Sequence, residues 1–407
     1  MDTVHNPDRF MADLRQILSQ GRKRIGLLVG AGAPLSVRVN NAGKLDPEGE
    51  PLIPGVEALT TQVMGKLEEK HKKAAASIQG SLPKGGNIES ILSKIRLFQT
   101  ALGNIEVEGL NGQGYQELGA DVCKAIGTIV GATLPEQRCA YHELITWISG
   151  AQRPHPVEIF TTNYDLLFES AFENARTPYF DGFSGAHAPF FDPVTVASDD
   201  LPSRWARLWK IHGSLGWKLE KDVVVRSGGY DSNELVYPDH LKYDLTQKQP
   251  YASLFERLKR FLLSPDTLLL TTGFSFRDAH ICDVIQDALA MNANASVFAF
   301  QYLNLDGEEP VRRLAVNLPN LSVYAADGAV ISGIPGKWRL GDPPKNWAEI
   351  RATFWGQRSG KGDPVFLLGD FATFCRFLAL SHSADIARPV PPVIETQSEE
   401  AAAVAHQ

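Results

Sequence analysis

The sequence predicts an α/β protein with a doubly wound (Rossmann-like), mostly parallel sheet, a helical insertion and a short helical C-terminal extension. Three observations indicate this fold class. Residues 24–35 (RIGLLVGAGAPL) form a short apolar segment that runs into a glycine turn, as a buried strand would. After Pro156, apolar strand-like segments alternate with helical ones, which is typical of a parallel sheet covered on both faces. Several of these segments end in glycine or polar residues, at the strand ends where doubly wound folds bind ligands.

The composition is that of an ordinary globular protein. Of the 407 residues, 43% are hydrophobic and 21% are charged. The net charge of −7 gives no general attraction to nucleic acid or to an anionic membrane, so we expect no direct nucleic acid binding and no membrane association. No apolar run approaches the ~18 residues that a membrane span requires, and the first residues lack the pattern of a secretion signal. We therefore expect a cytoplasmic protein.

The cysteines predict neither a zinc module nor a disulfide framework. They are far apart in the sequence and include no Cys-x-x-Cys pair, so we expect no zinc and interpret the thiols as small buried hydrophobic groups. The four residues are Cys123, Cys139, Cys282 and Cys375.

The first part of the chain is predicted to contain a strand, a long loop and a block of helices. The segment that follows the first strand, up to about residue 55, is rich in Gly, Asn, Asp and Pro and is interpreted as a functional loop. From residue 56 to about 150 the pattern is helical. Apolar residues recur at three- and four-residue steps from Ile88 to Phe98, with Asn87 placed to cap that helix.

The second part of the chain returns to strands and helices in alternation. Strands are expected in VEIFTT, RLWKIHGSLGW, TLLLTTG, ASVFAF and LSVYA. Helices are expected after Asp165, at residues 253–263 and from about Asp278. Two further helices are expected near residues 347–354 and 364–380. The predicted domains are a Rossmann domain of residues 1–55 and 151–335, a helical insertion of 56–150, a C-terminal extension of 336–384 and a disordered tail of 385–407.

Gly30, Ala31 and Gly32 form the first candidate ligand-binding turn. Two glycines at a strand end let the backbone approach a pyrophosphate closely, so that amide N–H groups can stabilise its charge. The full dinucleotide fingerprint is not met, because its third glycine would fall at Leu35, and this disfavours an ordinary hydride-transfer dehydrogenase. The alternative is a plain tight turn.

Thr162, Asn163 and Asp165 follow the next apolar segment in the motif Thr-Asn-Tyr-Asp. The carboxamide of an Asn at a strand end can accept and donate hydrogen bonds at once, so Asn163 could orient a water molecule while it holds a ribose hydroxyl. The alternative is that Thr162, Asn163 or Asp165 caps the following helix.

His212 and the motif Gly273-Phe274-Ser275 stand at two further strand ends. An imidazole takes up a proton near neutral pH, so His212 is a candidate base for a hydroxyl group. Gly273 allows close approach of a ligand and Ser275 can form a hydrogen bond with a ribose, while Asp278 is placed to cap the next helix. The alternatives are a structural histidine and a capped turn.

Taken together, these residues resemble the sirtuin-like NAD-binding family. The order Gly-Ala-Gly, Thr-Asn-x-Asp, His-Gly and Gly-x-Ser matches that family over roughly residues 25–330. The resemblance implies NAD bound in an extended pose, with the Gly30 turn at the pyrophosphate, Ser275 at the adenosine ribose, and Asn163 and His212 at the nicotinamide ribose. It also places Asp327 near the adenine. The expected cofactor-binding residues are Gly30, Ala31, Gly32, Thr162, Gly273, Ser275 and Asp327.

Two departures separate the chain from protein-deacylating sirtuins. Those enzymes carry a zinc module with paired Cys-x-x-Cys motifs, and the compact Gly-Ile-Pro-Asp-Phe-Arg pattern that they have after the glycine turn is reduced here to Ile-Pro-Gly at residues 53–55. The chain is more similar to bacterial immune members that hydrolyse NAD during phage infection, and most similar to the sirtuin-like partner of HerA-type hexameric ATPases. The resemblance thus implies a homo-oligomer that works with such an ATPase in antiphage (abortive infection) defence.

The expected activity is hydrolysis of the nicotinamide–ribose bond of NAD to nicotinamide and ADP-ribose. The cationic leaving group makes this bond weak, so the enzyme has to hold the ribose, stabilise developing charge and present water. The expected catalytic residues are Asn163 for positioning the water or the ribose hydroxyl, His212 as the base, and Asp165 for support of the local network. The alternatives are an NAD-dependent protein deacylase and a scaffold subunit that senses NAD without catalysis.

Overall fold

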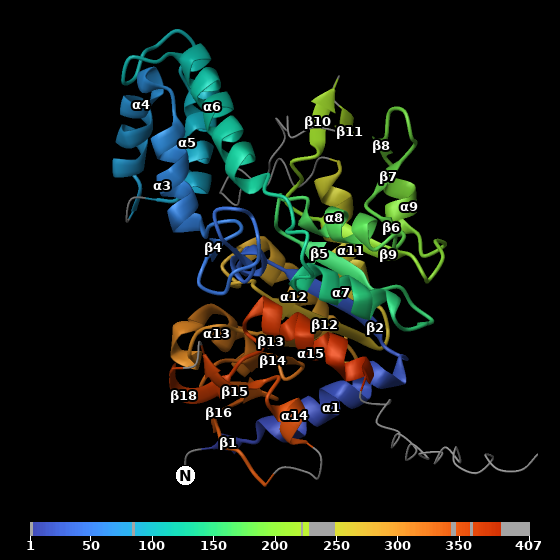
Figure 1. The fold of residues 1–407 in the computed structure, drawn as a ribbon. Coiled ribbons are helices and arrows are strands. Elements are labelled where there is room, and N and C mark those ends of the chain that lie inside the picture. The colour runs from blue at the N-terminus through green and yellow to red at the C-terminus, as the bar shows by residue number, and fades with distance from the viewer. Residues whose placement is uncertain are drawn as a thin grey trace, which may run out of the picture.

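The fold is organised around one large, mostly parallel sheet, drawn in Figure 1. The computed structural model describes residues 3–83, 86–220, 223–227, 249–342, 347–358 and 361–383. Within these residues the sheet has ten strands. In order across the sheet they are β1 (Val4–His5), β16 (Ile334–Trp338), β15 (Gly328–Ile331), β14 (Leu321–Tyr324), β13 (Ser296–Phe300), β12 (Thr267–Thr272), β2 (Arg24–Val29), β5 (Glu158–Thr161), β9 (Ala206–Lys210) and β6 (Tyr179–Phe180).

The sheet is wound in two directions from β2. The strands that come next in the chain, β5, β6 and β9, lie on one side of β2, whereas β12, β13 and β14 lie on the other. All of these strands are parallel, and β15 and β16 extend the sheet beyond β14 in antiparallel pairing. The predicted doubly wound α/β fold is confirmed. Its winding changes direction between β2 and β12.

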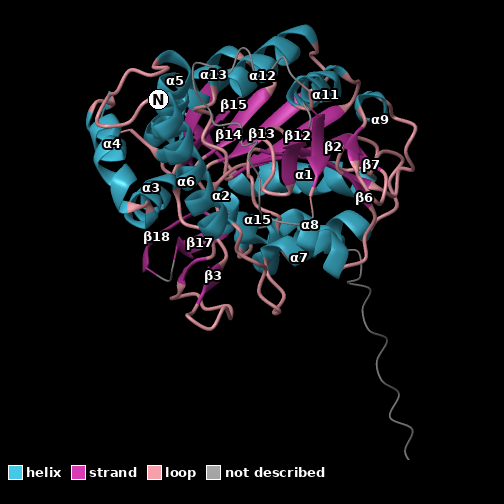
Figure 2. Cartoon of the chain, turned by 90° about the horizontal axis from the view of Figure 1, so that it is seen from above, coloured by secondary structure: helices cyan, strands magenta, loops and turns pink. Residues whose placement is uncertain are grey.

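Helices cover both faces of the sheet because successive buried side chains point to opposite faces. In β2, Leu27 packs in one hydrophobic core and Leu28 in the other, and Ile159 and Phe160 of β5 divide in the same way. Figure 2 shows the two helical layers with the sheet between them. One layer holds α1 (Pro7–Gln20), α7 (Ala140–Ser149), α8 (Leu167–Asn174) and α15 (Phe371–Ser383), and the other holds α11 (Tyr251–Leu263), α12 (Ala279–Met291) and α13 (Glu309–Asn317).

A group of four helices stands beside the sheet, at the upper left of Figure 1. These helices pack against one another. The expected cap on the third of them is confirmed, because the Asn87 side chain accepts a hydrogen bond from the Ser90 backbone N–H (2.9 Å). The Asn87 backbone N–H donates in return to the Ser90 hydroxyl (2.9 Å). The group consists of α3 (Val56–Lys66), α4 (Glu69–Gly80), α5 (Ile88–Ala101) and α6 (Gly112–Val130).

Smaller elements complete the described chain. Short helices are α2 (Gly32–Leu35), α9 (Pro193–Ala197), α14 (Ala348–Arg351) and the 3₁₀ turn Leu305–Gly307. A second, antiparallel sheet holds β10 (Trp217–Glu220), β11 (Val223–Arg226), β8 (Phe190–Phe191) and β7 (Phe183–Ser184). The loop after β2 contains a small ladder of β3 (Arg38–Val39) and β4 (Glu50–Pro51).

The C-terminal part differs from the sequence prediction. The helix expected at residues 364–380 is wrong at its start, because β17 (Trp355–Arg358) and β18 (Lys361–Phe366) form a hairpin and α15 begins at Phe371. Pro364 lies next to the irregular part of the pairing, between Lys361 and Val365, which have regular partners, and proline is found in strands at such positions. The tail expected to be disordered, residues 385–407, lies outside the described residues.

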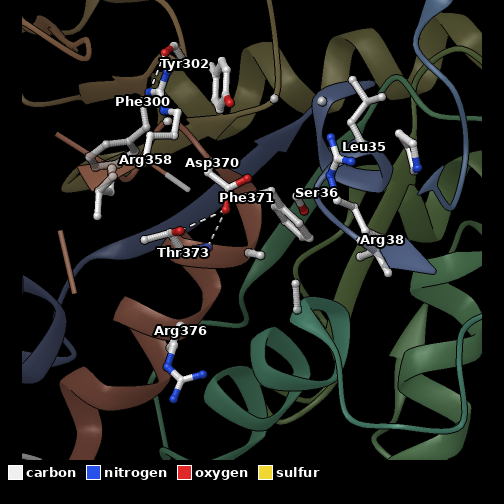
Figure 3. A pocket seen from close by; sticks show the side chains of 18 of the residues that line it. Leu35, Ser36, Arg38, Phe300, Tyr302, Arg358, Asp370, Phe371, Thr373 and Arg376 are labelled. Carbon is white, nitrogen blue, oxygen red and sulfur yellow. Dashed lines mark hydrogen bonds between the residues drawn. The ribbon is translucent and has the colours of Figure 1, made fainter. Parts of the chain in front are cut away.

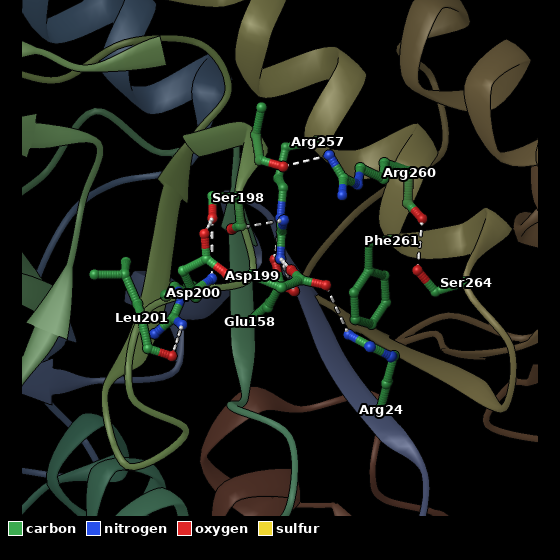
Figure 4. A network of polar contacts seen from close by, with 12 residues as sticks. Arg24, Glu158, Ser198, Asp199, Asp200, Leu201, Arg257, Arg260, Phe261 and Ser264 are labelled. Carbon is green, nitrogen blue, oxygen red and sulfur yellow. Dashed lines mark hydrogen bonds and ion pairs between the residues drawn. The ribbon is translucent and has the colours of Figure 1, made fainter. Parts of the chain in front are cut away.

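A buried ion pair links the amino ends of the strands to α11, as Figure 4 shows. Glu158, the first residue of β5, is 2% exposed in its side chain and accepts two hydrogen bonds from Arg257 (Nε–Oε2 2.8 Å, Nη2–Oε1 2.5 Å). The Trp209 indole donates a third bond to Glu158 (2.7 Å). Asp199 in turn joins Arg257 (2.9 Å) to Arg24 (3.3 Å). The charge of Glu158 is therefore fully compensated.

Removing the Glu158 carboxylate should destabilise the fold strongly. In Glu158→Ala the buried Arg257 guanidinium and the Trp209 N–H lose their acceptor, which should lower the free energy of unfolding by about 3–5 kcal/mol. Denaturant titration measures this change. The control is Asp306→Ala, because Asp306 is 92% exposed in its ion pair with Arg312 and should cost at most about 1 kcal/mol. Equal effects of the two substitutions would contradict the role of the buried pair.

Candidate functional site

Four of the predicted motifs lie side by side at the carboxyl edge of the sheet. Val29, the last residue of β2, pairs with Thr161 of β5 and with Thr272 of β12, and Thr161 pairs with Lys210 of β9. The residues that follow these strand ends are therefore neighbours. The edge lies where the sheet changes its winding direction, which is the usual ligand position in a doubly wound fold.

The glycine turns after β2 and β12 touch each other. Gly32 N–H donates to the carbonyl of Gly273 (2.9 Å), and Gly30 N–H donates to Thr272 (3.1 Å). A Cβ at Gly30 would lie 2.4 Å from the Gly273 oxygen, and one at Gly273 would lie 2.7 Å from the amide nitrogen of Ala33. Gly273 also has a φ of +63°, which disfavours any side chain. The close packing of two backbones therefore requires glycine at these positions, in addition to any requirement of a tight turn.

Asn163 joins the end of β5 to the glycine turn. Its side-chain amide donates to the carbonyl of Gly30 (3.1 Å), and its backbone N–H donates to the Thr161 hydroxyl (3.1 Å). The side chain is therefore held in one orientation, and the residue is 7% exposed. Asn163 does not cap the following helix, which begins at Leu167. Thr162 is half-buried and donates its backbone N–H to Val29 (3.2 Å).

Asp165 lies in a charged cluster below the rim. Its carboxylate accepts a hydrogen bond from the Leu167 N–H (3.1 Å), as a residue at a helix start would. Burial raises the pKa of Asp165, against the opposing attraction of Lys210. The Lys210 ammonium donates to the Asp165 carbonyl and to Glu169 (3.0 Å), whose pKa burial also raises. The cluster fixes the start of α8 beneath Asn163.

His212 is held at the same edge, two residues beyond β9. Gly213 follows with a φ of +94° and turns the chain there. The His212 Nε2 atom lies 3.1 Å from Oδ2 of Asp278, with both side chains less than a tenth exposed. Asp278 also accepts hydrogen bonds from His280 N–H (3.0 Å) and Ile281 N–H (3.2 Å), so its predicted role as a cap of α12 is confirmed. Its contact with His212 was not predicted from the sequence.

A cavity of about 1470 Å³ opens beside the glycine turns. Gly32, Gly273 and Ser275 line it, whereas Asn163, His212 and Asp165 lie outside its lining. Figure 3 shows Tyr302 and Arg358 at one end of the cavity and Leu35, Ser36 and Arg38 at the other, with α15 between them. The polar and aromatic lining residues that the sequence analysis did not single out include Arg38, Arg138, Gln301, Tyr302, Arg358 and Arg376.

Gln301 and Asp327 occupy different places around this cavity. Gln301 is 4% exposed and its side-chain amide donates to the carbonyl of Phe274 (3.1 Å), which ties the end of β13 to the loop after β12. Asp327 is exposed, lies outside the cavity lining and accepts a hydrogen bond from Leu305 N–H (2.8 Å). Ala31 is exposed next to the glycine turn and begins α2. The ligand roles of Ala31 and Asp327 stay predictions.

The described residues contain no metal centre of ordinary composition. No group of three or more His, Cys, Asp or Glu side chains among them is arranged to hold a metal ion. Among the helices that the structure describes, none is long and apolar enough to cross a membrane.

One family model matches a part of the chain that includes β5, β9 and β12 but not the glycine turn after β2. Residues 157–323 match the family model of the SIR2-like domain. SIR2 domains use NAD as a substrate, so the match indicates NAD-dependent activity. A similar solved structure, titled "Structural Basis for the Mechanism and Regulation of Sir2 Enzymes", is 12% identical, covers 72% of this chain and 86% of that chain, and has a TM-score of 0.32. A search of curated proteins found no similar sequence.

Because the two glycine turns touch, a methyl group added at Gly273 should destabilise the fold. Gly273→Ala should lower the free energy of unfolding by about 3 kcal/mol or more, since it adds a backbone clash to the strain of a positive φ. The control is Gly103→Ala, because Gly103 has a φ of +53° and nothing within 4 Å of its added Cβ. That variant should lose about 1–2 kcal/mol. Equal losses in thermal or denaturant unfolding would argue against close packing of the turns.

Because Asp165 is buried, replacing its carboxylate should stabilise the folded protein by an amount that depends on pH. Because its pKa is raised above the ordinary 3.8 in the folded protein, the unfolded chain ionises first as pH rises, and the wild type loses stability across that window. Asp165→Asn cannot ionise. Its free energy of unfolding relative to wild type, measured in denaturant titrations, should therefore increase as the pH rises above the ordinary pKa of 3.8. A relative stability that is constant or falls over this range would contradict the raised pKa.

Proposed function

We propose that the protein hydrolyses NAD at the nicotinamide–ribose bond and releases nicotinamide and ADP-ribose. The observation that carries this proposal is the arrangement at the carboxyl edge. Asn163 is anchored to the Gly30 turn, and the His212 Nε2 atom lies 3.1 Å from the Asp278 carboxylate. Both residues follow neighbouring strands of a SIR2-like region. An amide and an imidazole held in this way are suited to act on one sugar.

Each residue has a role that fits its contacts. The Asn163 side chain donates its amide hydrogen to Gly30, which leaves the carboxamide oxygen to orient a water molecule or a ribose hydroxyl. His212 takes the proton from that hydroxyl. Asp278, 3.1 Å from the ring, orients the imidazole and stabilises the cation that forms. Asp165 supports the site indirectly, through its hydrogen bond at the start of α8.

The remainder of the substrate fits the cavity next to these residues. Gly32 and Gly273 line the cavity without side chains, so a pyrophosphate can approach the backbone closely there, while the Gly32 N–H itself is bonded to the Gly273 carbonyl. The exposed Ser275 hydroxyl suits the adenosine ribose. The cavity of about 1470 Å³ exceeds the ~300–1,000 Å³ of ordinary small-molecule sites and is large enough for an extended nucleotide.

The biological setting is proposed on the resemblance of the sequence motifs alone. It comprises NAD depletion in antiphage defence, a homo-oligomer, a HerA-type ATPase partner and a cytoplasmic location. Light scattering of the protein with and without such an ATPase tests the assembly. A monomer that does not associate with the ATPase would contradict this part of the proposal.

Substitution of Asn163 should abolish nicotinamide release without unfolding the protein. We expect Asn163→Ala to lower the turnover of NAD by about 100-fold or more, because the water or hydroxyl loses its orientation. Chromatography of free nicotinamide, with and without the candidate ATPase, measures this rate. Asn317→Ala is the control, since Asn317 also donates its side-chain amide to a backbone carbonyl (3.0 Å) but lies on α13.

Three outcomes decide between the candidate activities. Turnover by Asn163→Ala at the wild-type rate would remove the proposed role of Asn163. Transfer of an acyl group to ADP-ribose when an acylated peptide is added would favour the deacylase. A wild-type protein that leaves NAD intact in both the absence and the presence of the ATPase would contradict the proposed hydrolysis.

A further inference from the structure

We propose that Tyr302 and Arg358 form a platform on which the adenine of the nucleotide stacks, so that the C-terminal hairpin completes the binding site. The identity of the nucleotide rests on the proposed function. The platform itself rests on the geometry of the two side chains and on their place in the cavity.

Arg358 lies over one face of Tyr302, and the residue as a whole stays exposed. The guanidinium carbon lies 3.9 Å from the centre of the Tyr302 ring, and Nη2 donates to the Tyr302 carbonyl (2.8 Å). Even with this cover, Tyr302 remains 47% exposed. An arginine stacked on an aromatic ring fixes that ring and leaves a flat surface for a second planar group.

The platform stands in the half of the site where the adenosine would lie. Tyr302 is two residues beyond β13, and it lines the same cavity as Gly273 and Ser275, which follow the neighbouring strand β12. Figure 3 shows Tyr302, Arg358 and Phe300 together at one end of this cavity. A purine offers a π-face to the phenol ring, and the guanidinium on the opposite face of that ring holds it in place.

The hairpin that carries Arg358 is fixed to the sheet, so the platform is formed before a ligand binds. Phe366 N–H of β18 donates to the Ala326 carbonyl after β14 (2.9 Å), and Leu367 N–H donates to Phe354 (2.8 Å). Phe354 and Phe366 are fully buried. Just before β17 in the chain, Arg351 of α14 forms an ion pair with Asp8 of α1 (2.5 Å). Because the hairpin holds Arg358 in place, this side chain should lose little conformational entropy when a ligand binds.

Binding of adenosine nucleotides tests the platform independently of catalysis. We expect Arg358→Ala and Tyr302→Ala to weaken the binding of ADP-ribose and of AMP by about ten-fold in calorimetric titration, whereas Tyr302→Phe keeps its ring and its affinity. For NAD turnover, Arg358→Ala should raise KM with kcat unchanged. The control is Arg313→Ala, which removes an exposed arginine of α13.

The outcomes separate this inference from the proposed reaction. If Arg358→Ala and Tyr302→Ala fold with unchanged unfolding midpoints and bind ADP-ribose and AMP as the wild type does, the platform is refuted, even if NAD is cleaved. Failure of the wild type to bind either probe also refutes it. If both variants lose affinity while the wild type leaves NAD intact, the platform stands and the hydrolysis falls.

Discussion

The carboxyl edge of the sheet depends on the contact between two glycine turns, one after β2 and one after β12. The backbones at Gly30, Gly32 and Gly273 approach so closely that a single Cβ would meet main-chain atoms. The contact joins the turns that follow β2 and β12, the two strands between which the sheet changes its winding direction. The Gly30 carbonyl then accepts the hydrogen bond that orients Asn163, and Gly273 leads directly to Ser275 and the cavity. The positions proposed for Asn163 and Ser275 follow from this packing.

The strand ends could be predicted because each one is a local pattern. An apolar segment that stops at glycine, Asn or His gives both the buried strand and the polar residue at its end, and parallel strands gather those ends at one edge. Asn87 and Asp278 were recognised as caps for the same reason, since a cap depends on residues within one turn. These features need no knowledge of distant contacts.

The contacts that join distant segments could not be predicted. The charge of Glu158 inside an apolar strand is explained by Arg257, which lies 99 residues away, and His212 meets Asp278 from a different strand end. Tyr302 and Arg358 are 56 residues apart, and the last residues of β18, 364–366, fall in a segment for which the sequence predicts a helix. The apolar spacing of residues 364–380 favours a helix, while the pairing of β18 with β17 decides for a strand in residues 361–366. Tertiary pairing overrides local preference there.

The two ends of the proposed site differ in how they recognise a nucleotide. At the β5 and β9 ends, nearly buried Asn163 and His212 are held by neighbours and suit chemistry on a ribose. At the β13 end, exposed Tyr302 with its arginine suits binding by stacking. A crystal structure of Asn163→Ala with NAD tests this arrangement most directly. We predict the nicotinamide ribose between residue 163 and His212, with the pyrophosphate at Gly32 and Gly273. NAD bound away from the carboxyl edge would contradict it.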